Sequence, residues 1–145
     1  PNSENPREQG CILKEFQSCE EIGLHYLNVL EDEEASIPYF KKGCTLNSAV
    51  SCTYLGNMYL EGKSVKKDPS LALQYYQSAC ELNDGIACTL LGYFYEKGEN
   101  VPQNPDTAES YYGRACREGD WADGCDSLNE LRNIRGRLKS EQKND

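Results

Sequence analysis

Apolar side chains recur along the chain in two alternating kinds of block, and both have the spacing of an amphipathic helix. The first kind, which we call helix A, covers 52–62 and 88–98, and the second, helix B, covers 69–80 and 105–116. Each carries one apolar stripe that it cannot bury without a neighbour. The pattern therefore predicts an all-α fold of stacked antiparallel helix hairpins. The stripe residues are Leu55, Gly56 and Tyr59 in helix A, and Leu71, Ala72, Tyr75, Ala79, Ala108, Tyr111, Tyr112 and Ala115 in helix B.

The helix ends are marked at equivalent places in the repeats. Gly62 and Gly98 are the last residues of the two helix A blocks, where glycine readily adopts the left-handed conformation that ends a helix. A capping side chain followed by proline opens each helix B, at 68–69 and at 104–105. The segment 36–38, with Ser36 and Pro38, is a variant of this start and predicts an earlier helix B.

A glycine also stands in the middle of each helix A, at Gly23, Gly56 and Gly92. Glycine inside a helix costs about 1 kcal/mol relative to alanine. Its recurrence at one position predicts that a neighbouring helix or a tyrosine ring packs against the bare backbone. The first repeat is shorter than the others, and the connection at 31–35 is where we place the deletion.

The eight cysteines form four pairs with separations of 8, 8, 8 and 9 residues, and the steps between pairs are 33, 36 and 36 residues. The first cysteine of each pair ends a helix B, and the second lies in the first turn of the next helix A. Eight cysteines allow 105 connectivities, and the repetition selects the one that joins neighbours. The alternative is a cytosolic protein with eight reduced, buried cysteines. The predicted bridges are Cys11–Cys19, Cys44–Cys52, Cys80–Cys88 and Cys116–Cys125.

Composition excludes several classes of function. Lys and Arg number 15 against 24 Asp and Glu, and a formal charge of -9 repels nucleic acid and anionic lipid surfaces. No run of apolar residues is long enough to span a membrane. With one histidine, His25, and no C-x-x-C motif, a zinc site is not expected. We predict no metal and no cofactor.

Long-lived disulfides place the chain in an oxidising compartment: a periplasm, the cell exterior, or the mitochondrial intermembrane space of a eukaryote. The 145 residues are enough for one domain. We expect a partial helix at 1–18, repeats at 19–47, 48–84 and 85–120, a C-terminal capping helix at 121–139 and a tail at 140–145.

A composite motif joins these observations: Cys-x-x-Leu-Gly-x-x-Tyr-x-x-Gly, then Val-x-Lys-Asp, then Ala-x-x-Tyr-Tyr-x-x-Ala-Cys. It resembles the Sel1-like repeat (SLR), a relative of the tetratricopeptide repeat (TPR), over roughly residues 6–130. The resemblance implies a right-handed α-solenoid. A cysteine pair in every repeat is similar to the Helicobacter cysteine-rich proteins, which implies a secreted or periplasmic protein with one disulfide per hairpin. The residues that carry it are Leu55, Gly56, Tyr59, Gly62, Val65, Asp68, Ala72, Tyr75, Ala79, Leu91, Gly92, Tyr95, Gly98, Val101, Ala108, Tyr111 and Ala115.

The resemblance also implies a function in binding. Repeats of this kind stack so that helix A lines a concave groove, where polar and aromatic side chains can hold an extended peptide. We therefore expect a non-catalytic scaffold for a protein or peptide. A basic C-terminal end and an acidic body raise the further hypothesis of self-stacking. The expected groove residues are Thr53, Asn57, Leu60, Thr89, Tyr93 and Glu96.

The alternative is a penicillin-binding protein or a weak β-lactamase, activities associated with the cysteine-rich subgroup. The S-x-x-K pattern of such enzymes occurs at 64–67 and at 140–143. The chemistry needs the serine at a helix start beside a buried lysine. Ser64 lies in a predicted loop and Ser140 in a predicted polar tail, so we expect no catalysis.

Overall fold

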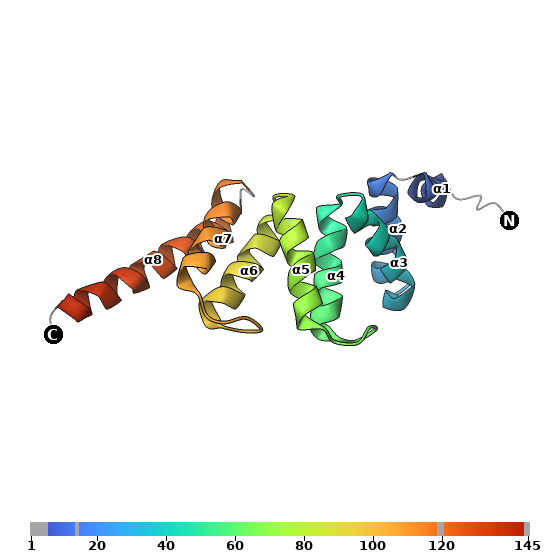
Figure 1. Cartoon of the computed structure of the whole chain (residues 1–145). Coiled ribbons are helices and arrows are strands. Elements are labelled where there is room, and N and C mark those ends of the chain that lie inside the picture. The colour runs from blue at the N-terminus through green and yellow to red at the C-terminus, as the bar shows by residue number, and fades with distance from the viewer. Residues whose placement is uncertain (1–5, 14, 119–120, 144–145) are drawn as a thin grey trace. The chain divides into compact units, whose positions relative to one another are not determined.

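Every regular element is a helix over the residues that the computed structural model describes, which are 6–13, 15–118 and 121–143. The fold is all-α and carries disulfides between successive helices. The chain divides into two compact units, Pro1–Leu82 and Asn83–Asp145. Figure 1 shows the order of the helices, α1 to α8.

The first unit consists of a short helix and two hairpins. Helices α2 and α3 pack as one antiparallel pair and α4 and α5 as the next, while α3 also packs against α4. Its core contains Ile37, Phe40, Leu55 and Met58. The bounds are α1 Pro6–Ile12, α2 Phe16–Asn28, α3 Glu33–Thr45, α4 Ala49–Glu61 and α5 Pro69–Glu81.

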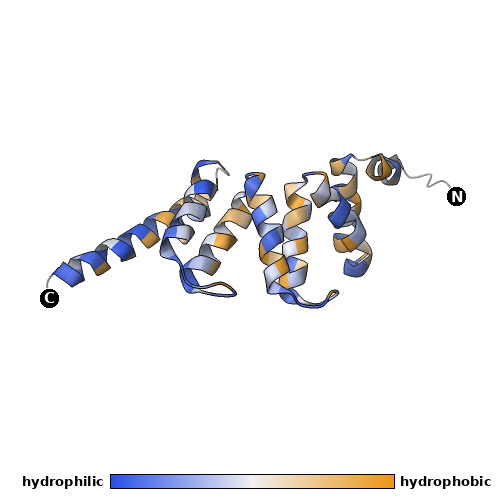
Figure 2. Ribbon diagram, viewed as in Figure 1, coloured by the Kyte–Doolittle hydropathy of each residue, from blue (hydrophilic) through white to orange (hydrophobic). Residues whose placement is uncertain are grey.

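The second unit is one hairpin and a longer helix. The hairpin of α6 (Gly85–Lys97) and α7 (Pro105–Arg117) is covered by α8 (Ala122–Lys143), which packs against both helices. Leu128 and Leu131 of α8 are buried there, whereas its last turns are hydrophilic (Figure 2). The helix continues through residues 140–143, the first part of the segment predicted as a tail. Residues 144–145 lie outside the described part.

The predicted helix ends are confirmed in the complete repeats. Gly62 and Gly98 both have φ of 71°, in the left-handed region, and end α4 and α6. The side chain of Asp68 accepts a hydrogen bond from the backbone N–H of Leu71 at 3.1 Å, and Asn104 caps α7 in the same way.

The predicted start of the first helix B at Ser36 is wrong. Helix α3 begins at Glu33 with Asp32 as its cap, and Pro38 lies inside the helix. The Asp32 carboxylate accepts a hydrogen bond from the backbone N–H of Ala35 at 3.0 Å. An acidic first turn favours this earlier start because of the helix dipole. The deletion lies at 29–32, four residues that replace the seven of 62–68.

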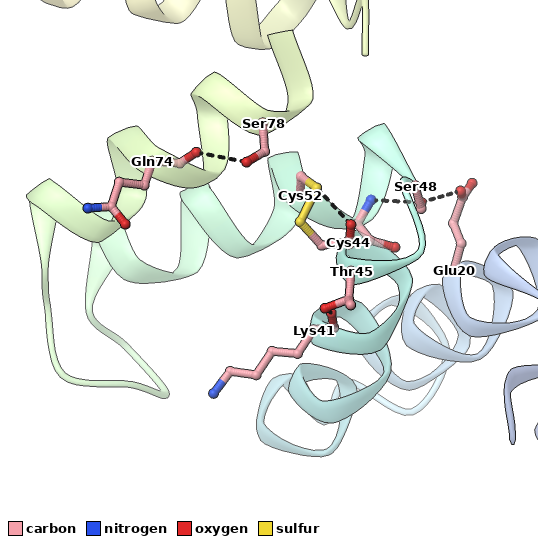
Figure 3. The surroundings of a disulfide bond; sticks show 9 residues. Glu20, Lys41, Cys44, Thr45, Ser48, Cys52, Gln74 and Ser78 are labelled. Carbon is pink, nitrogen blue, oxygen red and sulfur yellow. Dashed lines mark hydrogen bonds between the residues drawn. A yellow bond between two sulfur atoms is a disulfide. The ribbon is translucent and has the colours of Figure 1, made fainter. Parts of the chain in front are cut away.

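Disulfides join the end of each described helix B to the next helix A within a unit. The Cα atoms are 4.6 Å apart in Cys11–Cys19, 4.7 Å in Cys44–Cys52 and 4.5 Å in Cys116–Cys125. Figure 3 shows the Cys44–Cys52 bridge beside Ser48, whose hydroxyl donates to Glu20 at 2.8 Å. No described cysteine is free, and Cys80 and Cys88 are disulfide-bonded as well.

An ion-pair network holds α8 on α7. Glu109 accepts hydrogen bonds from Arg132 Nε at 2.9 Å and from Arg135 Nη1 at 2.6 Å. Arg135 also donates to Asp106 at 2.6 Å. The Arg132 hydrogen bond and the two guanidinium charges hold the pKa of Glu109 below its usual 4.5.

Because this pKa is lowered in the folded state, the stabilisation is present above pH 4.5 and is lost as the pH falls through the folded value. We expect Glu109→Gln to cost about 0.5–1 kcal/mol at neutral pH, the size of a partly exposed ion pair. The loss of stability should be smaller in acid. Chemical denaturation of the parent and the variant at about pH 6 and about pH 3 measures it. Glu141→Gln removes the same charge from an exposed site on α8 and is the control. A loss independent of pH would contradict this account.

Candidate functional site

An aromatic ring from helix B crosses the glycine of helix A in every hairpin. A Cβ added to Gly23 would lie 2.6 Å from the ring of Phe40, at Gly56 it would lie 2.6 Å from Tyr76, and at Gly92 it would lie 2.5 Å from Tyr112. The predicted packing of a ring on the bare backbone is thus confirmed. We call each of these crossings a glycine notch. It lets a helix B ring lie directly against the helix A backbone.

In the first unit the notch brings a hydroxyl to a predicted groove residue. The Tyr76 hydroxyl donates a hydrogen bond to Asn57 Oδ1 at 2.5 Å, although Tyr76 is only 1 % exposed. Burial, and then the charge of Glu61, raises the pKa of Tyr76 to about 12. The hydroxyl therefore stays protonated, and the Asn57 amide is held in place by it.

In the second unit the same ring has different neighbours. Tyr112 is 2 % exposed, and its ring lies against the backbone of Gly92. Burial raises its pKa above the usual value, as do the charges of Glu96 and Glu130 and the nearby Tyr93. The hydroxyl therefore stays protonated near neutral pH.

The predicted groove residues of α4 share one face but differ in exposure. Thr53, Asn57 and Leu60 are spaced by four and three residues, which places them on one side of a helix. Thr53 is 7 % exposed, so a ligand cannot use its side chain. Asn57 and Leu60 are half-buried.

The predicted groove residues of α6 have the same spacing and are more accessible. Tyr93 is 40 % exposed, and its hydroxyl donates to Glu99 Oε1 at 3.2 Å. The Thr89 hydroxyl donates back to the Gly85 carbonyl at 2.7 Å. The Glu96 side chain is 18 % exposed and lies 3.5 Å from Lys97 Nζ.

The repeat geometry matches that of known proteins. A family model described as "Sel1 repeat" matches residues 49–84 and 85–120. The structure of Helicobacter pylori cysteine rich protein B (hcpB) is 32 % identical, covers 86 % of this chain and 98 % of that chain, and has a TM-score of 0.65. The chain belongs to the Sel1-repeat family. No curated protein sequence matches it.

Two further Sel1-repeat structures show the same fold. A Sel1 repeat protein from Oxalobacter formigenes is 24 % identical, with 86 % of this chain and 95 % of that chain covered and a TM-score of 0.76. The c5321 protein, a protective antigen of uropathogenic Escherichia coli with an SLR fold, is 23 % identical with the same TM-score. The match covers 86 % of this chain and 27 % of that one.

The candidate serines of this Sel1-repeat protein lie outside any catalytic arrangement that the structure describes. Ser64 is in the loop between α4 and α5, and Lys67 of its motif is exposed. The Ser140 hydroxyl donates to the carbonyl of Gly136 in the last turns of α8. Among the described residues no group of three metal-ligating side chains occurs, and no helix is long and apolar enough to span a bilayer.

Sequence reasoning missed the role of the second tyrosine of helix B. Tyr112 belongs to an apolar stripe, and a stripe residue is read as packing alone. The available signal was the recurring mid-helix glycine, which indicates that a ring lies against it. Glu130 was missed as well. It lies five residues after Cys125, as Tyr93 lies five residues after Cys88, but its helix lacks the Leu-Gly pair that marks this register.

Proposed function

We propose that the chain is an exported, non-catalytic scaffold that binds an extended segment of a protein or peptide on the helix A face of its repeats. The observation that carries this proposal is that helix A has a packed apolar face and a separate accessible face. Its apolar stripe packs in the core, while Asn57, Leu60, Tyr93 and Glu96 keep accessible surface on another face.

The side chains on this face suit a peptide backbone. The Asn57 amide is fixed by Tyr76, so little rotamer freedom remains to be lost when a ligand binds. Tyr93 offers a broad aromatic face at low entropic cost. A rigid surface of this kind favours binding of a segment in extended form.

The compartment follows from the cysteines. Disulfides are consistent with an oxidising environment, because cytosolic thiols are kept reduced. Within that class we propose the periplasm or the cell exterior for a bacterial protein, and the mitochondrial intermembrane space for a eukaryotic one.

A peptide selection tests the binding proposal. A library of random peptides is displayed on phage and selected against the immobilised, non-reduced chain, and affinities of the enriched peptides are measured by calorimetry. We expect Asn57→Ala or Tyr93→Ala to weaken binding by about tenfold, or about 1.4 kcal/mol. Gln74→Ala and Ser110→Ala, at exposed positions of α5 and α7, are controls that should bind as the parent does.

The outcomes separate the helix A face from the rest of the surface. Peptides that lose affinity through Asn57→Ala or Tyr93→Ala and not through the controls support the proposal. No enrichment of any peptide, or loss only through the control positions, would overturn it.

A further inference from the structure

We infer that the chain binds a second copy of itself head to tail, with the loop between α2 and α3 of one copy seated in a pocket beside α8 of the next. The loop presents Val29 and Leu30, which we call the apolar pair. The pocket, which we call the α8 pocket, is lined by Leu131, Ile134 and Leu138 among others. This association goes beyond the proposed function and does not depend on it.

The α8 pocket is an apolar hollow of about 280 Å³ in the second unit. Leu131, Ile134 and Leu138 lie three and four residues apart, so they form one stripe along α8. Pro105, at the start of α7, belongs to the same lining. Leu131 is buried whereas Leu138 is 53 % exposed, so the stripe runs from the core of the unit onto its surface. An aliphatic side chain placed there would remove apolar surface from water.

The apolar pair is exposed where the next repeat packs its loop valine. Val29 is 65 % exposed and Leu30 is 54 % exposed. In the longer connection between α4 and α5, Val65 is partly buried against the core. The shorter connection is anchored at its end, because the backbone N–H of Asp32 donates to the Tyr26 carbonyl at 2.8 Å. The two apolar side chains are therefore presented at a fixed place on the surface of the first unit.

Charge selects a second copy as the occupant of the α8 pocket. Residues 15–34 carry seven Glu or Asp and no Lys or Arg, and four of the seven follow the apolar pair directly at 31–34. Residues 132–143 of α8 carry five Lys or Arg and one Glu. The acidic loop and the basic helix attract each other, whereas loop against loop or helix against helix brings like charges together. The contact that charge favours is therefore head to tail.

Basic side chains remain available around the α8 pocket. Arg137 and Lys139 are exposed on either side of Leu138 in the sequence. The acidic member of the pocket lining, Glu96, lies 3.5 Å from Lys97, so its charge is compensated within α6. The two arginines that hold α8 on α7 are already paired, and the attraction of the loop would come chiefly from the other basic groups of α8.

The test is sedimentation velocity of the whole, oxidised chain over a range of concentrations up to about 1 mM. A contact of one loop with one pocket is small, so we expect a dissociation constant on the order of 100 µM. The average mass should rise with concentration and pass that of a dimer, because a heterologous contact leaves one surface of each pair free. Raising the salt from about 50 mM to about 500 mM should weaken the association severalfold.

Three exposed leucines supply matched variants. Leu30→Ser in the apolar pair and Leu138→Ser in the α8 pocket should each weaken the association at least about tenfold. Leu13→Ser removes the same side chain from a site that is 73 % exposed and belongs to neither surface, so it should associate as the parent does. Circular dichroism melts verify that all three variants are folded.

Mixing the variants tests the direction of the contact. The Leu30→Ser chain keeps an intact α8 pocket, and the Leu138→Ser chain keeps an intact apolar pair. An equimolar mixture should therefore associate again where neither variant does alone. It should stop at two chains, because both of the altered surfaces are then left over.

Several results would overturn the head-to-tail contact and leave the scaffold function standing. One is a parent chain that stays monomeric at about 1 mM in low salt. Another is association that Leu13→Ser weakens as much as Leu30→Ser does, or a mixture of the two surface variants that stays monomeric. A monomeric parent that binds a capped peptide of residues 28–34 would assign the α8 pocket to an acidic segment of another protein.

Discussion

Reducing the disulfides should unfold the chain under conditions where the oxidised form is stable. Each bridge closes a loop of eight or nine residues, and the loss of such a loop costs roughly 2–3 kcal/mol in the chain-entropy account. Four of them amount to on the order of 10 kcal/mol, which is the whole stability of a typical domain. The measurement is a thermal melt by circular dichroism with and without a phosphine reductant.

A single-bridge variant supplies the graded control. Cys44→Ser combined with Cys52→Ser removes one loop and should cost roughly 2–3 kcal/mol, with the remaining chain still folded. Alkylation of thiols after full reduction verifies that every bridge was opened. A fully alkylated chain that keeps its helical signal and its melting temperature would show that the helices hold without the cysteines.

Alanine in place of Gly56 should destabilise the chain by about 2 kcal/mol, although alanine is the better helix former. The new Cβ would lie 2.6 Å from Tyr76 Cε1, and the ring is 1 % exposed and tied to Asn57 by its hydroxyl. Overpacking of this kind costs about 1–3 kcal/mol, and loss of the hydrogen bond adds about 1 kcal/mol. The higher helix propensity of alanine offsets about 1 kcal/mol of this loss of stability.

The matched control is the same substitution in an open helix. A Cβ at Gly136 would meet nothing within 4 Å, so Gly136→Ala should stabilise the chain by up to about 1 kcal/mol. Chemical denaturation of both variants gives the comparison. Gly56→Ala combined with Tyr76→Leu should recover part of the loss, because the smaller side chain vacates the notch. Equal effects at the two glycines would contradict the notch.

Local chemistry in the sequence predicted most of the fold. Gly62 and Gly98 marked helix ends because their left-handed conformation is costly for other residues. Asp68 and Asn104 marked helix starts because they satisfy backbone N–H groups that the helix cannot. Periodic cysteines indicated the bridges, because neighbouring cysteines recur in every repeat at a separation of eight or nine residues.

The sequence-based prediction differed from the structure where one sequence signal is compatible with two conformations. Ser36 and Pro38 resemble a helix start, yet Asp32 is also a cap, and the chain used the earlier one. Residues 140–143 are polar throughout, so no apolar stripe in the sequence marked that α8 extends to Lys143. The surroundings of Tyr112 could not be predicted, because they depend on how α8 packs against α6.

The glycine notch separates the architecture of a repeat from the chemistry that it presents. The ring at the crossing is Phe40 in one hairpin and tyrosine in the next two, and the backbone accepts either. A single oxygen atom on this ring decides whether helix B can hydrogen-bond a side chain of helix A, as Tyr76 does with Asn57. The polar contacts of each hairpin can therefore change through the helix B ring alone, while the backbone of the repeat stays the same.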